Sequence, residues 1–355
     1  MSNSWLDKQI MMTLSGIAYY GDVSGQLKNP TYATQNDWSL VWGPVDDWYG
    51  NRAYAALSTS TGKYAVAIRG TDTDFGWDAF INMYNDLNVL WQVEWDYFFA
   101  SQGAMVSQGT YTQLSYLLDH ATWDGQTLAQ FIESIPANTP IAVTGHSLGG
   151  NLATVLGAWI SFKRGPQSGT PDNSTEIYTF AAPSPGNRAF ASAYNARLPG
   201  SFRYWNSLDI VPRAWDNLPE LYSIYDSIGI PTPAWIQDAI YTILYLPLEW
   251  SEWKYNSYYQ QNNGDGSKLL GSPAPWITDW ISEAISQHAV NTYLGLLNAP
   301  LIKSSANLAL SSLRAGPAIR RLSVDKEKLP PDFIAQVAAF SQKSSNAARL
   351  RNRLL

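Results

Sequence analysis

The spacing of the apolar residues changes within residues 140–163. The run Ile141–Thr144 is short and uninterrupted, as in a buried strand, whereas from Leu148 the apolar positions recur every three or four residues, which predicts a helix. Gly145-His-Ser-Leu-Gly149 lies at the junction. A direct turn from strand to helix needs small residues beside Ser147 and raises its hydroxyl at the helix N-terminus. The pattern therefore predicts a nucleophilic serine, and a glycine-rich turn without chemistry is the alternative.

A helical stripe and a hairpin are predicted before this junction. Residues 5–20 carry apolar side chains at helical spacing, and two strand-like runs, residues 53–60 and 63–69, are joined by Thr61-Gly62. The second run ends at Gly70-Thr71. A buried strand with this ending can present backbone N–H groups and a hydroxyl to a developing negative charge, although a plain turn would have the same sequence.

Residues 75–99 are rich in aromatic and aliphatic side chains. This composition fits a helix of the core, and it also fits a mobile amphipathic cover that closes over a binding site and opens against lipid. We favour the cover.

Strands and helices alternate through the rest of the first two thirds of the chain. The predicted elements are helices at Tyr111–His120 and Thr127–Ile135, the strand and helix around Ser147, a strand at Ile177–Phe180, a helix at Asn187–Arg197 and a strand at Phe202–Trp205. The alternation predicts an α/β fold with a mainly parallel sheet and helices on both faces. Reactive groups gather at the carboxyl ends of such strands, where Thr71, Ser147 and Asp209 are expected.

Residues 215–275 interrupt the alternation with many tyrosines and tryptophans. They are too long for a bare loop and predict a helical insertion, which either caps the site or packs on the body. A helix from about Trp276 follows and brings His288. We expect one main domain, residues 1–302, and a C-terminal extension, residues 303–355.

Composition narrows the possibilities further. The 355 residues include no cysteine, which excludes disulfides and thiolate metal sites. No apolar run is long enough to span a membrane, and neither a cofactor nor a metal is expected. The start of the chain lacks the features of a secretory signal, so a cytoplasmic location and export by a signal-independent route both remain open.

Charge is distributed unevenly. Residues 70–162 contain nine acidic residues and no lysine or arginine. A site for nucleic acid or polyphosphate needs cations near its working residues, so these substrates are not expected. Residues 303–355 contain ten basic and three acidic residues. A basic amphipathic stretch there could lie on an anionic membrane, whereas docking on the acidic body or fraying are the simpler alternatives.

A serine nucleophile needs a base and a carboxylate that orients it. The chain has three histidines. The side chain of His146 is expected to point away from that of its neighbour Ser147, and His120 precedes the serine. His288 follows both Ser147 and Asp209, and the order Ser, Asp, His is that of α/β-hydrolases, so His288 is the preferred base and Asp209 the preferred acid.

The chain resembles the class 3 lipases, typified by the fungal triacylglycerol lipases. The segments that carry the resemblance are Leu14–Tyr19, Ile68–Thr71, Asn82–Leu87, Gly145–Gly150, Phe180–Asn187, Asn206–Pro212 and His288. The resemblance implies an α/β-hydrolase fold, a catalytic triad of Ser147, Asp209 and His288, and an oxyanion hole formed by Thr71 and the backbone N–H of Leu148. Residues 73–101 would be the lid. The insertion at 215–275 and the extension after 302 have no counterpart in this resemblance.

We therefore expect a serine ester hydrolase for lipid acyl esters, most specifically a triacylglycerol lipase working at an oil–water or membrane interface through its lid or basic tail. An esterase for soluble or phenolic esters is the alternative enzyme. A non-catalytic lipid-binding protein on a hydrolase scaffold is the alternative from another class.

Overall fold

A seven-stranded sheet forms the centre of the computed structural model, which describes residues 5–71, 77–98, 102–167, 170–263 and 266–302. Its strands are, in spatial order, β1 (Trp38–Asp46), β2 (Arg52–Ser58), β3 (Tyr64–Ile68), β8 (Ile141–His146), β9 (Thr175–Phe180), β10 (Ser201–Asn206) and β11 (Ser267–Leu269). The first three are antiparallel neighbours, and all pairs from β3 to β11 are parallel. The predicted mainly parallel α/β sheet is confirmed.

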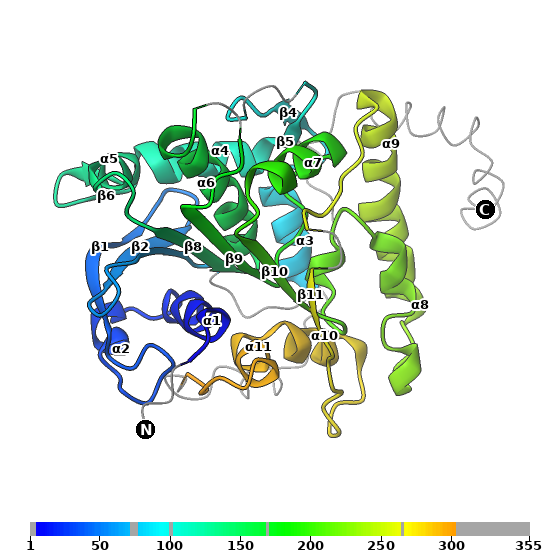
Figure 1. Ribbon diagram of the computed structural model, residues 1–355. Coiled ribbons are helices and arrows are strands. Elements are labelled where there is room, and N and C mark those ends of the chain that lie inside the picture. Colours follow the sequence, from blue (N-terminus) through cyan, green and yellow to red (C-terminus); the bar gives the residue numbers. More distant parts are fainter. Residues whose placement is uncertain (1–4, 72–76, 99–101, 168–169, 264–265, 303–355) are drawn as a thin grey trace.

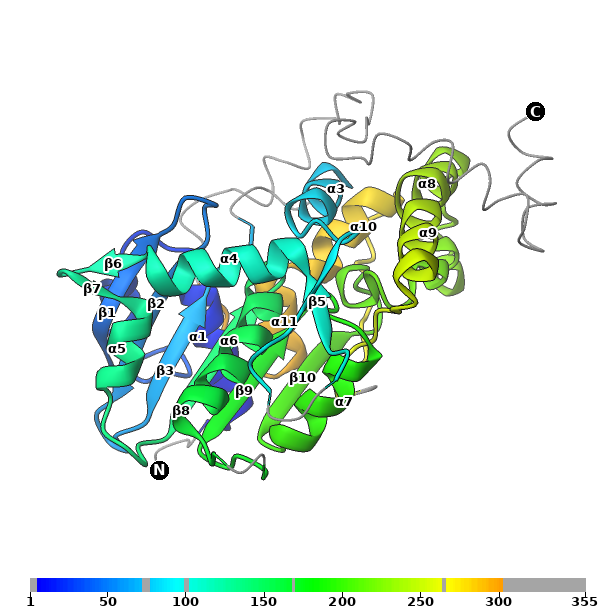
Figure 2. The same ribbon diagram turned by 90° about the horizontal axis from the view of Figure 1, so that it is seen from above.

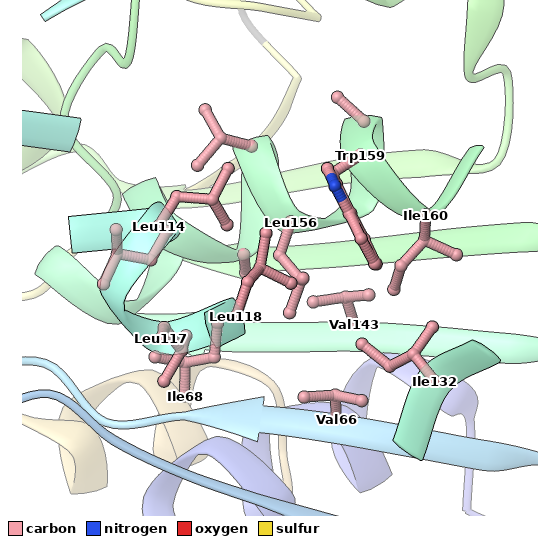
Figure 3. Close-up of a cluster of buried hydrophobic side chains, with 14 of the residues drawn as sticks. Val66, Ile68, Leu114, Leu117, Leu118, Ile132, Val143, Leu156, Trp159 and Ile160 are labelled. Atoms are coloured by element: carbon pink, nitrogen blue, oxygen red, sulfur yellow. The ribbon is translucent and has the colours of Figure 1, made fainter. Parts of the chain in front are cut away.

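Helices cover both faces of this sheet (Figure 1). One face carries α1 (Asp7–Ile17), α2 (Val23–Leu27) and α11 (Val290–Leu296), and the other carries α4 (Gln108–Asp119), α5 (Leu128–Ser134), α6 (Leu148–Arg164) and α7 (Arg188–Arg197). Each face buries its own apolar cluster. Figure 3 shows part of one cluster, in which Leu156 and Trp159 of α6 lie near Val143 of β8. The helix that follows Ser147 is therefore held against the sheet by apolar packing.

Two strands extend the sheet beyond the sequence prediction. β1 pairs with β2 at one edge, and its register is irregular around Trp42, which blurs any alternation of apolar and polar residues. β11 lies at the opposite edge, inside the region predicted as a helical insertion, and is only three residues long. A strand of three residues has too few positions to show a period.

Two further strand pairs are small. β4 (Gln92–Glu94) pairs with β5 (Met105–Ser107), and β6 (Thr122–Trp123) pairs with β7 (Gln126–Thr127).

The aromatic segment and the insertion form a third apolar cluster at one end of the sheet. Figure 2 shows α3 (Trp77–Asp86), α8 (Ala234–Ala239), α9 (Leu246–Tyr255) and α10 (Trp280–His288) gathered there. A π-helical stretch, Ile240–Tyr245, joins α8 to α9. Phe80 and Tyr84 of α3 lie against Trp215, with ring centroids 6.0 and 5.2 Å apart. The insertion contains α8 and α9 and packs against the aromatic segment.

Hydrogen bonds also tie the insertion to the chain that follows α3. Ser251 donates to the carbonyl of Leu90 (2.5 Å), and the hydroxyl of Tyr259 donates to the carbonyl of Val89 (2.9 Å). Gln92 donates to the carbonyl of Ser257 (2.9 Å). The C-terminal side of the aromatic segment is thus hydrogen-bonded to the insertion.

Two predicted segments extend beyond the described residues. Of the predicted lid, residues 73–101, the described ranges include 77–98, and the predicted extension, residues 303–355, lies outside them. Within the part of the chain that is described, none of the helices combines the length and the apolar character needed to cross a membrane.

Candidate active site

Ser147 lies in the sharp turn between β8 and α6, as predicted. Its backbone is in an uncommon region (φ 61°, ψ −130°), which for a residue with a side chain indicates strain held in place by its surroundings. The flanking glycines explain how the turn fits. A Cβ on Gly145 would lie 2.0 Å from the carbonyl oxygen of Gly149, and a Cβ on Gly149 would lie 2.3 Å from the carbonyl oxygen of Ile68. Larger residues cannot occupy either position without moving the backbone.

Asp209 and His288, which are 79 residues apart in the sequence, form a buried pair. His288 Nδ1 lies 3.0 Å from Asp209 Oδ1 and 2.9 Å from Oδ2, and the two residues are 2% and 0% exposed. A carboxylate oxygen only accepts, so Nδ1 carries the hydrogen and Nε2 is the basic nitrogen of the neutral ring. This is the orientation that a general base of a serine hydrolase requires.

Two further donors hold the Asp209 carboxylate. The backbone N–H of Val211 donates to Oδ1 (3.0 Å), and the hydroxyl of Tyr293 donates to Oδ2 (2.8 Å). Tyr293 also accepts from the backbone N–H of Asn206 (3.0 Å) at the end of β10. Burial and the nearby Asp209 raise the pKa of Tyr293 well above its ordinary value, so its hydroxyl remains a donor.

His288 also lies beside the serine turn. The side chain of His146, the residue before Ser147, contacts the backbone carbonyl of His288 through Nε2 (2.9 Å), and the two rings are 4.8 Å apart. The structure thus brings three of the predicted residues, Ser147, Asp209 and His288, into one region. His120 is elsewhere, at the end of α4 against Tyr116, with ring centroids 4.7 Å apart.

The two predicted oxyanion residues flank Ser147 from different elements. Leu148 is the first residue of α6, and Thr71 follows β3 by three positions. A Cβ on Gly70 would lie 2.9 Å from the Cβ of Ser147, so the segment that follows β3 directly borders Ser147. Backbone N–H groups at a helix N-terminus favour negative charge, as an oxyanion hole requires.

Sequence reasoning did not single out Tyr19, Tyr293 or Asn206 for the site. Tyr19 is in one of the segments that carry the family resemblance, which was its only signal. Asn206 likewise begins one of these segments. Tyr293 has no signal, because ordinary patterning does not distinguish a buried tyrosine that orients a carboxylate from one that packs in the core.

Three further carboxylates, all in the insertion, line a cavity of about 410 Å³. Its acidic lining residues are Asp216, Glu249 and Glu252. Burial raises the pKa of Glu252 to about 7, and the neighbouring Glu249 and Asp216 add to this effect.

Comparisons with known proteins find similar sequences and structures among lipases. The family model described as Lipase (class 3) matches residues 65–217, which include the serine turn and Asp209. Lipase ZK262.3 of Caenorhabditis elegans is 27% identical over 218 residues, which are 58% of this chain and 54% of that protein, so the chain spans about half the length of this relative. The crystal structure of M37 lipase is similar at 26% identity and a TM-score of 0.69, over 83% of this chain and 95% of that one. Residues 65–217 therefore match the class 3 lipase family, and the chain is similar to lipases in sequence and in fold.

Proposed function

We propose that the protein hydrolyses the acyl esters of lipids, and specifically triacylglycerols, through an acyl-enzyme on Ser147. Ser147 Oγ attacks the ester carbonyl while His288 takes its proton and then returns it to the leaving alcohol. Asp209 orients His288, and the backbone at Thr71 and Leu148 stabilises the oxyanion. Water activated by His288 then releases the fatty acid and restores the serine.

The His288–Asp209 pair is the observation that carries this proposal. Its two Nδ1–carboxylate distances, 3.0 and 2.9 Å, select the ring tautomer in which Nε2 can accept a proton. Its contact with His146 places that ring next to the serine turn. Packing alone would not require a buried carboxylate here, because an unpaired buried charge is strongly unfavourable.

The cover supports an insoluble substrate. Phe80 and Ile81 of α3 are buried in the same cluster as Leu148, beside the nucleophile. Ser147 is 3% exposed, so α3 must move for a bulky ester to reach it. An amphipathic helix that exchanges this buried face for contact with lipid would expose the serine at the interface. The absence of lysine and arginine from residues 70–162 favours neutral esters over anionic ones.

Replacing the nucleophile tests the mechanism. Ser147→Ala should abolish hydrolysis of p-nitrophenyl esters, whereas Ser115→Ala, which removes a serine hydroxyl from α4, should leave it unchanged. A fluorophosphonate should label the wild type and the Ser115→Ala variant but not Ser147→Ala. Hydrolysis retained by a folded Ser147→Ala protein would refute the proposed mechanism.

Rate against substrate concentration tests the substrate class. A lipase should accelerate when a triglyceride passes its solubility limit and droplets appear. Saturation below that limit, or higher activity on a feruloyl ester than on any triglyceride, would instead identify an esterase for soluble or phenolic esters. Lipid binding without turnover or labelling would identify a non-catalytic protein. Faster turnover of anionic phospholipids than of neutral glycerides would contradict the preference for neutral esters.

We also propose that residues 1–302 form the hydrolase domain and that residues 303–355 are an extension with a separate role. A chain ending at residue 302 should keep its activity on soluble esters. If it also binds anionic vesicles as tightly as the full chain does, the basic tail is not the membrane contact.

A further inference from the structure

A chain of hydrogen bonds joins the segments that carry the proposed catalytic groups. The backbone N–H of Gly70 donates to Tyr19 Oη (3.1 Å), and Tyr19 Oη lies 3.0 Å from His146 Nδ1. On the other side of the ring, His146 Nε2 lies 2.9 Å from the carbonyl oxygen of His288. Tyr19, which follows α1, thus connects the end of β3 to the serine turn, and His146 connects that turn to the backbone of the base.

The direction of each hydrogen bond follows from the groups involved. The carbonyl of His288 can only accept, so His146 Nε2 carries the hydrogen. The N–H of Gly70 can only donate, so Tyr19 Oη accepts from it, and the Tyr19 hydroxyl can donate to Nδ1 of His146 when that nitrogen carries no hydrogen. A neutral His146 with its hydrogen on Nε2 satisfies all of these contacts. Its burial agrees with this, because burial, together with the neighbouring His288, lowers the pKa of His146 well below its ordinary value.

Close packing holds these groups in place. A Cβ on Gly70 would lie 2.5 Å from Tyr19 Oη and 2.6 Å from the carbonyl oxygen of His146. The His146 ring also lies edge-on to Tyr293, which binds Asp209, with ring centroids 5.6 Å apart. His146 therefore contacts both His288 and Tyr293, the residue that binds Asp209. Its own side chain is not available as a base.

We propose that Tyr19 and His146 are positioning residues that hold the Gly70–Thr71 segment and the backbone of His288 in register with Ser147. The kinetic consequence of this inference rests on the proposed function, whereas the hydrogen-bond chain itself does not. Neither side chain contacts the reacting atoms. They act by fixing the distance between the nucleophile, its base and the oxyanion donors, and a displacement of about 1 Å among such groups is enough to slow a reaction substantially.

The state of the His146 ring tests the hydrogen-bond chain without any substrate. Nuclear magnetic resonance of isotopically labelled histidine nitrogens should resolve the three rings, and the signals of His146 are those missing in His146→Gln. We expect His146 to remain neutral with its hydrogen on Nε2 between about pH 5 and 8, a range in which an ordinary histidine titrates. In Tyr19→Phe its Nδ1 signal should shift. Protonation near pH 6, or a hydrogen on Nδ1 of the neutral ring, would overturn the inference even if the protein proves to be an active lipase.

Kinetics test the positioning role. Tyr19→Phe should lower kcat for a soluble p-nitrophenyl ester by roughly 10- to 100-fold with little change in KM. The variant leaves buried groups without their hydrogen-bond partner, and this loss slows the reaction by that factor if it destabilises the transition state. Tyr32→Phe is the matched control, since Tyr32 is buried and donates to Gln26 (3.0 Å) away from the site. Equal kcat in the two variants would overturn the inference.

A pair of substitutions at His146 separates positioning from packing. His146→Gln keeps an N–H that can reach the carbonyl of His288, whereas His146→Leu keeps only the bulk. We expect His146→Gln to retain at least tenfold more kcat than His146→Leu at similar stability. Equal activities would mean that the ring only fills space. If the wild type hydrolyses no ester at all, the proposed function fails, and the tautomer of His146 still decides whether the hydrogen-bond chain exists.

Discussion

Removing the hydroxyl of Tyr293 should weaken both the fold and the catalytic pair. This hydroxyl donates to Asp209 Oδ2 (2.8 Å) and accepts from the N–H of Asn206 (3.0 Å), and Tyr293 is 0% exposed. A hydrogen bond to a charged group contributes about 1.5–3 kcal/mol, and a buried N–H left without its acceptor costs about 1–3 kcal/mol. Since the two effects share one hydroxyl and are not fully additive, we expect Tyr293→Phe to lose about 2–4 kcal/mol of unfolding free energy.

Tyr54→Phe provides the comparison for this variant. Tyr54 is also 0% exposed, but its hydroxyl donates only to the uncharged carbonyl of Leu14 (2.7 Å), in α1. We expect this control to lose about 1 kcal/mol and to keep its kcat. Urea unfolding at neutral pH measures the first quantity, and initial rates on a soluble p-nitrophenyl ester measure the second.

The kinetic part follows from the same bond. With one donor removed, the Asp209 carboxylate can rotate, and the hydrogen bond that fixes His288 weakens, so kcat for Tyr293→Phe should fall about tenfold, equivalent to about 1.4 kcal/mol. If Tyr293→Phe and Tyr54→Phe are equally stable and equally active, Tyr293 does not hold the acid, and the reasoning from these two distances is wrong.

Three further predictions follow from individual contacts. Asp209→Asn should lower kcat by a factor on the order of 10⁴, because an amide no longer selects the productive tautomer of His288; unchanged rates would exclude Asp209 as the acid. Gly149→Ala should cost on the order of 3 kcal/mol, because its Cβ would meet backbone at 2.3 Å, whereas Gly295→Ala, with nothing within 4 Å in an exposed turn of α11, should gain about 0.5–1 kcal/mol; thermal unfolding compares the two. The raised pKa of Glu252, about 7, means that the folded protein holds this proton more tightly than the unfolded chain, so stability falls as pH rises from about 4.5 to 7. Glu252→Gln should therefore be about 1–3 kcal/mol more stable than the wild type at pH 8 and equal to it near pH 4, and a difference independent of pH would contradict this assignment.

The main sheet and the serine turn could be predicted because their signals are local. An apolar run followed by helical spacing identified β8 and α6, and the glycines around Ser147 reported a turn that admits no larger side chain. The hairpin β2–β3 was equally visible, since two alternating runs and a short turn lie within about twenty residues. Patterns of this kind come from residues that lie close together in the sequence.

The edge strands and the supporting residues of the site could not be predicted in this way. β11 is a strand because it pairs with β10, some sixty residues away. Its three residues are too few to show an alternation of apolar and polar positions. Tyr19 meets His146 across 127 positions, and Tyr293 meets Asp209 across 84. Which distant partner a buried tyrosine will contact depends on the assembled fold, so only the family resemblance gave Tyr19 a signal.

The third apolar cluster has a consequence for how activity is acquired during folding. It joins α3, the loop that follows Asp209 and the helices of the insertion, which are separated by more than a hundred residues in the sequence. Contacts of such long range form late, after the hairpin and its neighbouring helices have closed. During refolding, secondary structure should therefore return before the ability to react with a fluorophosphonate. The reaction of Ser147 with a fluorophosphonate would then show that the segments most distant in the sequence have packed together.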